Sequence, residues 1–227
     1  MEENANLTAE RSLEIITEQI ERSQNVVAKN TGQSLYLSGL ATMVTAVIVA
    51  LVNGLSTTPD GHLLWLVLPL VIWWIMRIHH KKQVQAPVSF VGTLVGKTWW
   101  TFGVIVIGFY LFAIIWNFLA LRLSDNPATF AQAMVTITPV IILLMGMAVA
   151  ITGHILKRRW LVLFGIIGGL LVAFCGYSGV VSTLIVSSGA SVKTIIVLNL
   201  ITPCVSVFLF SLIGLMIPGW MLKKQNP

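Results

Sequence analysis

The chain has 227 residues, of which 56% are apolar and only 10% charged, and its formal net charge is +6. Soluble domains carry about 25% charged residues, so this composition and a mean hydropathy of +0.89 indicate a membrane protein. The cations lie at the ends of apolar segments, where they set membrane topology, so the positive charge does not indicate nucleic-acid binding. No cleavable signal peptide is expected, because the first apolar segment begins only near Ser34, behind a polar leader.

Residues 1–33 form this leader, which contains six of the eight acidic residues and is expected to be a cytoplasmic amphipathic helix and a linker. Thr8 is the expected N-cap, and the helix is expected to end near Lys29 or Asn30. One apolar stripe follows helical spacing and consists of Leu13, Ile16, Ile20 and Val27. The opposite face carries Glu14, Glu18, Glu21 and Arg22.

A helix that lies on a membrane surface usually has a basic polar face, whereas this polar face is acidic. The stripe is therefore a candidate docking surface for a cytoplasmic protein or for a second copy of the chain. Packing of the stripe on the protein's own loops is the alternative interpretation.

Six apolar segments follow, and most of them reach the length of about 20 residues that a membrane-spanning helix needs. They are predicted at residues 35–55, 63–78, 98–121, 133–156, 160–182 and 195–222. The second segment is short and contains Pro69, and Pro139 is expected to kink the fourth. The sixth segment is long and contains Pro203 and Pro218, so we expect it to be tilted or broken. The predicted fold is an all-α integral membrane protein in which residues 34–222 form a bundle of six transmembrane helices.

The basic residues support an arrangement in which both termini are cytoplasmic. With six spans, twelve of the fourteen Lys and Arg residues lie on the cytoplasmic side, which includes the tail 223–227, and the outer loops hold only Arg122 and Lys193. Leaving out the short second span would move Arg122 inside and the basic turn 157–159 outside, so the distribution of basic residues favours six spans over five. The expected location is the inner membrane of a bacterium.

Small residues recur at every fourth position in three segments, which allows helix backbones to approach closely. In the first segment these residues are Ser38, Thr42, Ala46, Ala50 and Gly54. In the stretch 143–173 they are Gly146 and Ala150 before the turn Lys157-Arg158-Arg159, and Gly165, Gly169 and Ala173 after it. The three cations of the turn belong at a membrane surface, so this stretch is expected to be a tightly packed hairpin. Association into a homo-oligomer through the small-residue faces is also expected.

The sequence offers little chemistry for catalysis. No Asp or Glu lies in a predicted membrane segment, and no metalloprotease, serine-hydrolase or phosphate-loop motif occurs. We therefore predict that the protein is not an enzyme and needs no cofactor or metal, with Cys175 and Cys204 as small apolar side chains. The weak polar candidates are His154, Asn117 and Asn199. We interpret His154 as an interfacial histidine near the lipid headgroups, or alternatively as a ligand-binding group. Asn117 and Asn199 are interpreted as interhelical hydrogen-bond partners, or alternatively as the lining of a solute path.

Several short stretches resemble a known family. They are Leu7-Thr8-Ala9-Glu10-Arg11-Ser12-Leu13-Glu14-Ile15-Ile16, Asn30-Thr31-Gly32, Leu144-Met145-Gly146-Met147 with Thr152-Gly153, and Ile217-Pro218-Gly219 before Lys223-Lys224. Together they resemble a family of uncharacterised small multi-pass, six-helix membrane proteins of Bacteroidota bacteria that have an amphipathic leader. The resemblance implies no catalytic residues. It also implies a link to regulation or stress response, because members often lie near winged-helix regulators.

Two functions fit these features. The first is a non-enzymatic inner-membrane protein that acts in membrane sensing or regulation through its N-terminal helix. The alternative is a small-solute transporter, channel or permease subunit that works with a separate ATPase. The proline-containing segments favour the alternative, as do the three segments in each half, which would allow an inverted repeat.

Overall fold

The computed structural model describes residues 2–56, 59–80, 90–123, 137–175, 187, 189 and 192–224. The elements in these ranges are all helical, which confirms the predicted all-α fold for this part of the chain. Four of its helices are long and apolar enough to cross a membrane, namely Arg11–Ser56, Phe90–Leu123, Thr138–Ile155 and Val197–Lys224. Two further apolar helices, Leu63–Ile78 and Arg159–Leu170, are shorter.

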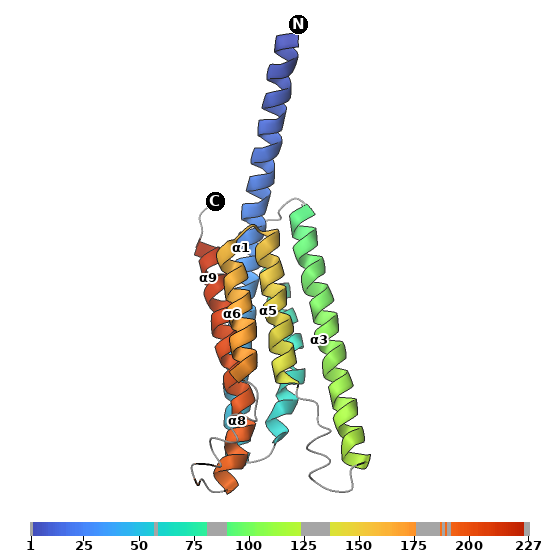
Figure 1. The fold of residues 1–227 in the computed structure, drawn as a ribbon, viewed down its shortest axis with the longest axis vertical. Coiled ribbons are helices and arrows are strands. Elements are labelled where there is room, and N and C mark those ends of the chain that lie inside the picture. The colour runs from blue at the N-terminus through green and yellow to red at the C-terminus, as the bar shows by residue number, and fades with distance from the viewer. Residues whose placement is uncertain are drawn as a thin grey trace.

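The long helices run up and down along one long axis (Figure 1). The elements are the helix α1 (Glu2–Ser56), the 3₁₀ helix η1 (Pro59–Leu66), and the helices α2 (Leu68–His80), α3 (Phe90–Leu123), α5 (Thr138–Ile155), α6 (Arg159–Cys175) and α8 (Val192–Phe210). The π-helical segment η2 (Ser211–Met216) and the helix α9 (Ile217–Lys224) continue α8 in one rod. Figure 1 shows the end of α9 at the end of the bundle from which the N-terminal part of α1 stands out alone.

The helix α1 is continuous over 55 residues, so the predicted helix end near Lys29 or Asn30 and the linker up to residue 33 are wrong. Glycine inside a helix costs about 1 kcal/mol relative to alanine, so Gly32 is an unfavourable residue at this position of α1. In the structure, the absence of a side chain at Gly32 allows another helix to pack closely against α1. A Cβ at Gly32 would lie 2.9 Å from the carbonyl oxygen of Gly219, so the glycine lets α1 and α9 touch through their backbones.

Pro69 in the predicted second span and Pro139, which was predicted to kink the fourth, both lie in the first turn of a helix. α2 begins at Leu68, one residue before Pro69, and α5 begins at Thr138, one residue before Pro139. A first-turn N–H has no partner within its helix, so proline is tolerated there, and Pro139 starts the helix rather than kinking it. The helix α3 begins at Phe90, eight residues earlier than predicted. Residues 133–136 and 176–182 of the predicted spans lie outside the described residues.

The last predicted span, which was expected to be tilted or broken, is helical throughout, because a widened turn accommodates Pro218. In an α-helix the proline ring would collide with the carbonyl four residues earlier, that of Gly214. In η2 the helix widens, and the N–H of Ile217 donates to the carbonyl of Leu212, five residues back. The chain therefore passes Pro218 without a break.

The core lies between α1, α5, α6 and the rod formed by α8, η2 and α9. Its buried apolar side chains are Val27, Ala28, Leu35, Val95, Ile142, Val149, Leu156, Leu161, Phe210, Leu215 and Leu222. The helix α3 stands at the edge of the bundle (Figure 1) and packs mainly on α5. Most of its large apolar side chains are exposed, for example Ile115 at 67%. An apolar surface of this extent is typical of helices that contact lipid.

Candidate functional site

The most distinctive surface is the part of α1 that extends beyond the bundle, residues 2–24, which we call the projecting helix (Figure 1). At a rise of about 1.5 Å per residue it is about 35 Å long. The apolar stripe runs along it, and the exposed fractions of its first three side chains are 64% for Leu13, 54% for Ile16 and 51% for Ile20. Val27, the fourth member, is buried in the bundle core. The predicted stripe therefore has an exposed part, formed by Leu13, Ile16 and Ile20, and one buried residue, Val27, that packs in the bundle core.

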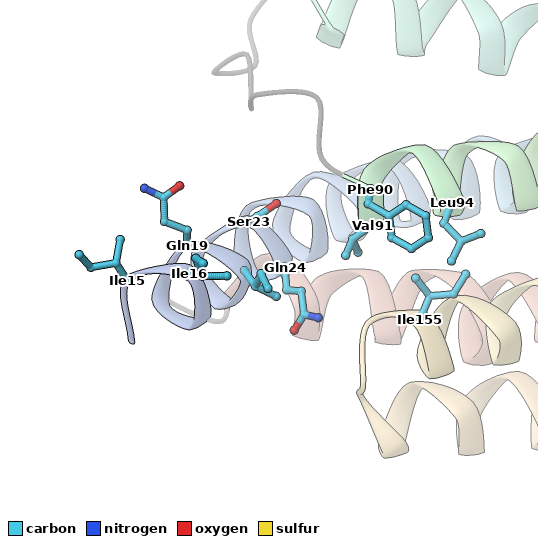
Figure 2. A pocket seen from close by; sticks show the side chains of 10 residues that line it. Ile15, Ile16, Gln19, Ser23, Gln24, Phe90, Val91, Leu94 and Ile155 are labelled. Carbon is cyan, nitrogen blue, oxygen red and sulfur yellow. The ribbon is translucent and has the colours of Figure 1, made fainter. Parts of the chain in front are cut away.

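A pocket of about 760 Å³ lies where the projecting helix leaves the bundle, and we call it the base pocket. Figure 2 shows side chains from α1, from the first turns of α3 and from the last turn of α5 around it. Its lining residues are Ile15, Ile16, Gln19, Ile20, Ser23, Gln24, Phe90, Val91, Leu94 and Ile155. No charged side chain is among them. The exposed stripe and the base pocket thus form one continuous apolar surface.

The charged residues of the projecting helix lie away from the base pocket. One exposed side of the helix carries Glu14, Glu18 and Glu21 at helical spacing. The exposed side opposite the stripe also carries Arg11 and Arg22. None of these five side chains lines the pocket. Charge and apolar surface are therefore separated around this helix.

The predicted basic turn lies beside the base of the projecting helix. Arg158 donates from its backbone N–H to the carbonyl of Gly153 over 2.8 Å, and Lys157 donates to the carbonyl of His154 over 3.1 Å. This pair of bonds is a Schellman motif, which places the residue after the helix cap in the left-handed region, and Lys157 has φ 55°. The side chain of Arg158 reaches Asn25 of α1, with its Nη2 3.1 Å from Oδ1.

The structure brings the small residues of the hairpin together. A Cβ at Gly146 would lie 2.5 Å from the Cα of Gly169, and a Cβ at Gly165 would lie 2.5 Å from the backbone nitrogen of Ala150. The backbones of α5 and α6 are therefore in direct contact. The side chain of Ala173, the last member of this set, lies outside the described residues, as does that of Cys175.

The predicted small-residue face of the first span is only partly used for close packing. Ala46 is buried, and Gly54 lies near Ile201 of α8. The hydroxyls of Ser38 and Thr42 donate to carbonyls of α1 itself, and Ala50 is half-buried.

Gly32 and Gly39, seven residues apart, let α1 approach the rod closely, and a Cβ at Gly39 would lie 3.0 Å from the Cβ of Leu215 and 3.3 Å from the carbonyl oxygen of Ser211. A search for glycines seven residues apart would have found this pair.

The three weak polar candidates do not form one site. His154 is exposed in the last turn of α5, at the end of the bundle that carries the basic turn. Asn117 and Asn199 are half-buried near the opposite end, on α3 and α8, which lie on different sides of the bundle (Figure 1). No group of three His, Cys, Asp or Glu side chains that could hold a metal ion occurs among the described residues.

The prediction overlooked Asn53, which lies in the last turn of α1 and is fully buried. Neither atom of its amide group has a hydrogen-bond partner among the described residues, and it packs against Gly61 of η1. The hydroxyl of Ser211 in η2 is likewise buried without a partner there. An asparagine inside the apolar run before Gly54 was the available signal for this group.

The candidate site therefore consists of the exposed stripe, the base pocket and the basic turn beside them, with Asn53 as a separate buried polar group. No protein-family model, no curated protein and no solved structure matches this chain.

Proposed function

We propose that the protein is a non-enzymatic, multi-pass protein of the bacterial inner membrane, in which the bundle holds the projecting helix at the cytoplasmic surface for contact with another polypeptide. In this proposal the contact serves membrane sensing or regulation. The observation that carries it is the continuous apolar surface made by the exposed stripe and the base pocket. Such a surface is unfavourable in water, and burying it against another protein is worth about 25 cal/mol for each Å² of apolar area removed from solvent.

The proposed topology has six spans with both termini in the cytoplasm. Four helices are long and apolar enough to cross a membrane, and the two shorter apolar helices would supply the fifth and sixth crossings of this proposal. The basic turn 157–159, the end of α9 and the N-terminal part of α1 lie at one end of the bundle, which fits the excess of cations predicted on the cytoplasmic side.

The base pocket belongs on the aqueous side of the membrane interface. On α3 the pocket residue Leu94 is followed by Lys97, Trp99 and Trp100, which are residue types typical of the interface itself. The projecting helix extends from there away from the spans (Figure 1). A partner from the cytoplasm can therefore reach the stripe without entering lipid.

The test replaces Ile16 and Ile20 by aspartate in one variant, and Glu14 and Glu18 by glutamine in a matched control. Each variant is cross-linked in native membranes and purified, and the polypeptides that co-purify with it are compared with those of the wild-type chain. We expect the associations to be lost in I16D/I20D and kept in E14Q/E18Q. If all associations survive in I16D/I20D, a docking role for the stripe is ruled out.

A second candidate function is transport of a small uncharged or anionic solute, alone or as a permease subunit with a separate ATPase. Two observations favour it, namely the buried, unpartnered amide of Asn53 and the π-helical segment η2 before Pro218. Wider helical turns of this kind often occur at functional sites. Flux of radiolabelled solutes into proteoliposomes that N53A abolishes would support this function, and an absence of flux together with an absence of any co-purifying ATPase would count against it.

A further inference from the structure

We propose that one face of α1, between the turn 157–159 and the end of α9, binds the phosphate group of an anionic lipid at the membrane surface. The three cations that bind it are Lys29 of α1, Arg158 of the turn and Lys223 of α9. This face lies on the opposite side of α1 from the stripe, so the inference goes beyond the docking function and does not depend on it. It requires only that this end of the bundle lies at a membrane surface.

The first observation is a row of residues along this face. It follows intervals of four, three and four residues and consists of Asn25, Lys29, Gly32 and Tyr36. At one end of the row, the guanidinium of Arg158 donates to the side-chain oxygen of Asn25 over 3.1 Å. Lys29 lies one turn further along, and its side chain is exposed. Because residues four apart have Cβ atoms about 5–6 Å apart, Arg158 and Lys29 can donate to the same phosphate group.

Lys223 supplies the third cation, near the other end of the row. Its backbone nitrogen would lie 2.9 Å from a Cβ at Gly32, three residues after Lys29. Its ammonium lies 5.7 Å from the centre of the Tyr36 ring, and this cation–π contact keeps it on the membrane side of Lys29. The row spans eleven residues, about 16 Å at 1.5 Å per residue. Cations from three separate parts of the sequence therefore lie along one short stretch of α1.

The second observation is that acidic residues are missing around these cations. The sequence contains no Asp or Glu in residues 22–59 or in residues 137–224. The nearest acidic residue of α1 is Glu21, eight residues from Lys29 and about 12 Å away along the helix axis. Exposed charges at that separation are largely screened, since the Debye length is about 8–10 Å. A phosphate beside Lys29 would therefore meet cations and no nearby carboxylate.

The third observation is the depth of the row in the membrane and its access to lipid. Trp160 directly follows the basic turn, and Trp220 lies four residues before the end of α9. With Tyr36 they are of the residue types that mark the headgroup level. Beyond Tyr36, the same side of α1 carries Leu40 and Val47, whose exposed fractions are 42% and 45%. This part of α1 faces acyl chains, so a lipid can reach the row from within the bilayer.

The chemistry of the three side chains suits a phosphodiester. Arginine and lysine donate charge-assisted hydrogen bonds to phosphate oxygens, and the bond to Asn25 uses only one of the five N–H donors of Arg158. Basic sites between transmembrane helices bind anionic headgroups in this way. Lys157 and Lys224 lie at the same end of the bundle but not on the row, and the ammonium of Lys224 lies over the ring of Trp220 instead. They attract anionic lipid only by their charge, which makes them suitable controls.

Native mass spectrometry of the full chain in detergent tests the site. Dioleoyl phosphatidylglycerol, which is anionic, and dioleoyl phosphatidylcholine, which has a phosphate but no net charge, are titrated separately. The site variant is K29Q/K223Q, and the control K157Q/K224Q removes two cations from the same end of the bundle. We expect the wild-type chain and the control to hold one phosphatidylglycerol at least about tenfold more tightly than K29Q/K223Q, because a hydrogen bond to a charged group contributes about that factor.

Equal weakening in the two double variants would show that only the total charge counts, and it would overturn the site. Equal affinity of the wild-type chain for the two lipids would overturn it as well. Inorganic phosphate distinguishes the source of the group, because displacement of phosphatidylglycerol by inorganic phosphate at the same concentration would overturn the assignment to a lipid. If a double variant does not fold, Lys29→Gln and Lys157→Gln provide the same comparison, since both side chains are exposed.

Discussion

The guanidinium of Arg158 donates a hydrogen bond of 3.1 Å to the side-chain oxygen of Asn25. The two residues lie 133 positions apart in the sequence and join the turn between α5 and α6 to the base of the projecting helix. A hydrogen bond of this kind contributes about 1 kcal/mol. We therefore expect Arg158→Ala to leave the bundle folded and to loosen the base of the projecting helix.

Hydrogen–deuterium exchange of the peptide that covers residues 20–30 measures this loosening. Exchange should be faster in Arg158→Ala than in the wild-type chain. Arg159→Ala is the control, because it removes a cation from the same turn. Equal exchange in the two variants would mean that the bond to Asn25 does not hold the helix.

Lys157 has φ 55°, a left-handed backbone conformation that costs a residue with a Cβ about 1 kcal/mol. We expect Lys157→Gly to raise the thermal unfolding midpoint, because glycine adopts this conformation without strain. Lys157→Ala is the matched control, since it removes the same charge and keeps the Cβ. The expectation fails if both variants unfold at the same temperature.

The contact between α5 and α6 should not tolerate one added methyl group. A Cβ at Gly165 would meet backbone atoms of Ala150 and Gly146, which cannot move aside as a flexible side chain could. Gly165→Ala should therefore destabilise the protein by about 1–3 kcal/mol, as overpacking does.

Unfolding by denaturing detergent measures this loss. Gly103→Ala in α3 is the control, because no heavy atom lies within 4 Å of a Cβ built there. Equal stability of the two variants would show that the close approach of α5 and α6 is not required.

Asn53 is buried with neither amide atom paired among the described residues, and an unsatisfied buried polar group costs about 1–3 kcal/mol. We expect Asn53→Val to raise the thermal midpoint, because it removes the polar group and keeps the position filled. Asn53→Asp should lower the midpoint, because it places a charge there. A lower midpoint in Asn53→Val would instead indicate that the amide binds water or a solute, which bears directly on the transport function.

The proposed topology predicts which cysteines a membrane-impermeant maleimide can reach in intact cells. Arg122→Cys lies in the last turn of α3, on the proposed outer side, and should react without permeabilisation. Lys157→Cys and Lys223→Cys lie on the proposed cytoplasmic side and should react only after permeabilisation. Labelling of Lys157→Cys in intact cells would reverse the topology and place the projecting helix outside the cytoplasm.

Hydropathy and spacing along the sequence were sufficient to predict an all-helical protein, its apolar segments and the stripe of Leu13, Ile16 and Ile20. These features are local, because they depend on residues a few positions apart. The structure also places Gly146 and Gly165 face to face, and both stand out in the sequence because a short turn must bring neighbouring helices together.

Packing between residues that are far apart in the sequence determines the remaining features of the fold. Gly32 and Pro218 look like breaks in isolation. α1 continues through Gly32 because Gly219 packs against it, and a widened turn carries the last rod past Pro218. The base pocket likewise exists only because α1 passes beside the first turns of α3 and the last turn of α5. The free energy of such contacts depends on which backbones meet in space, and only the tertiary structure determines that.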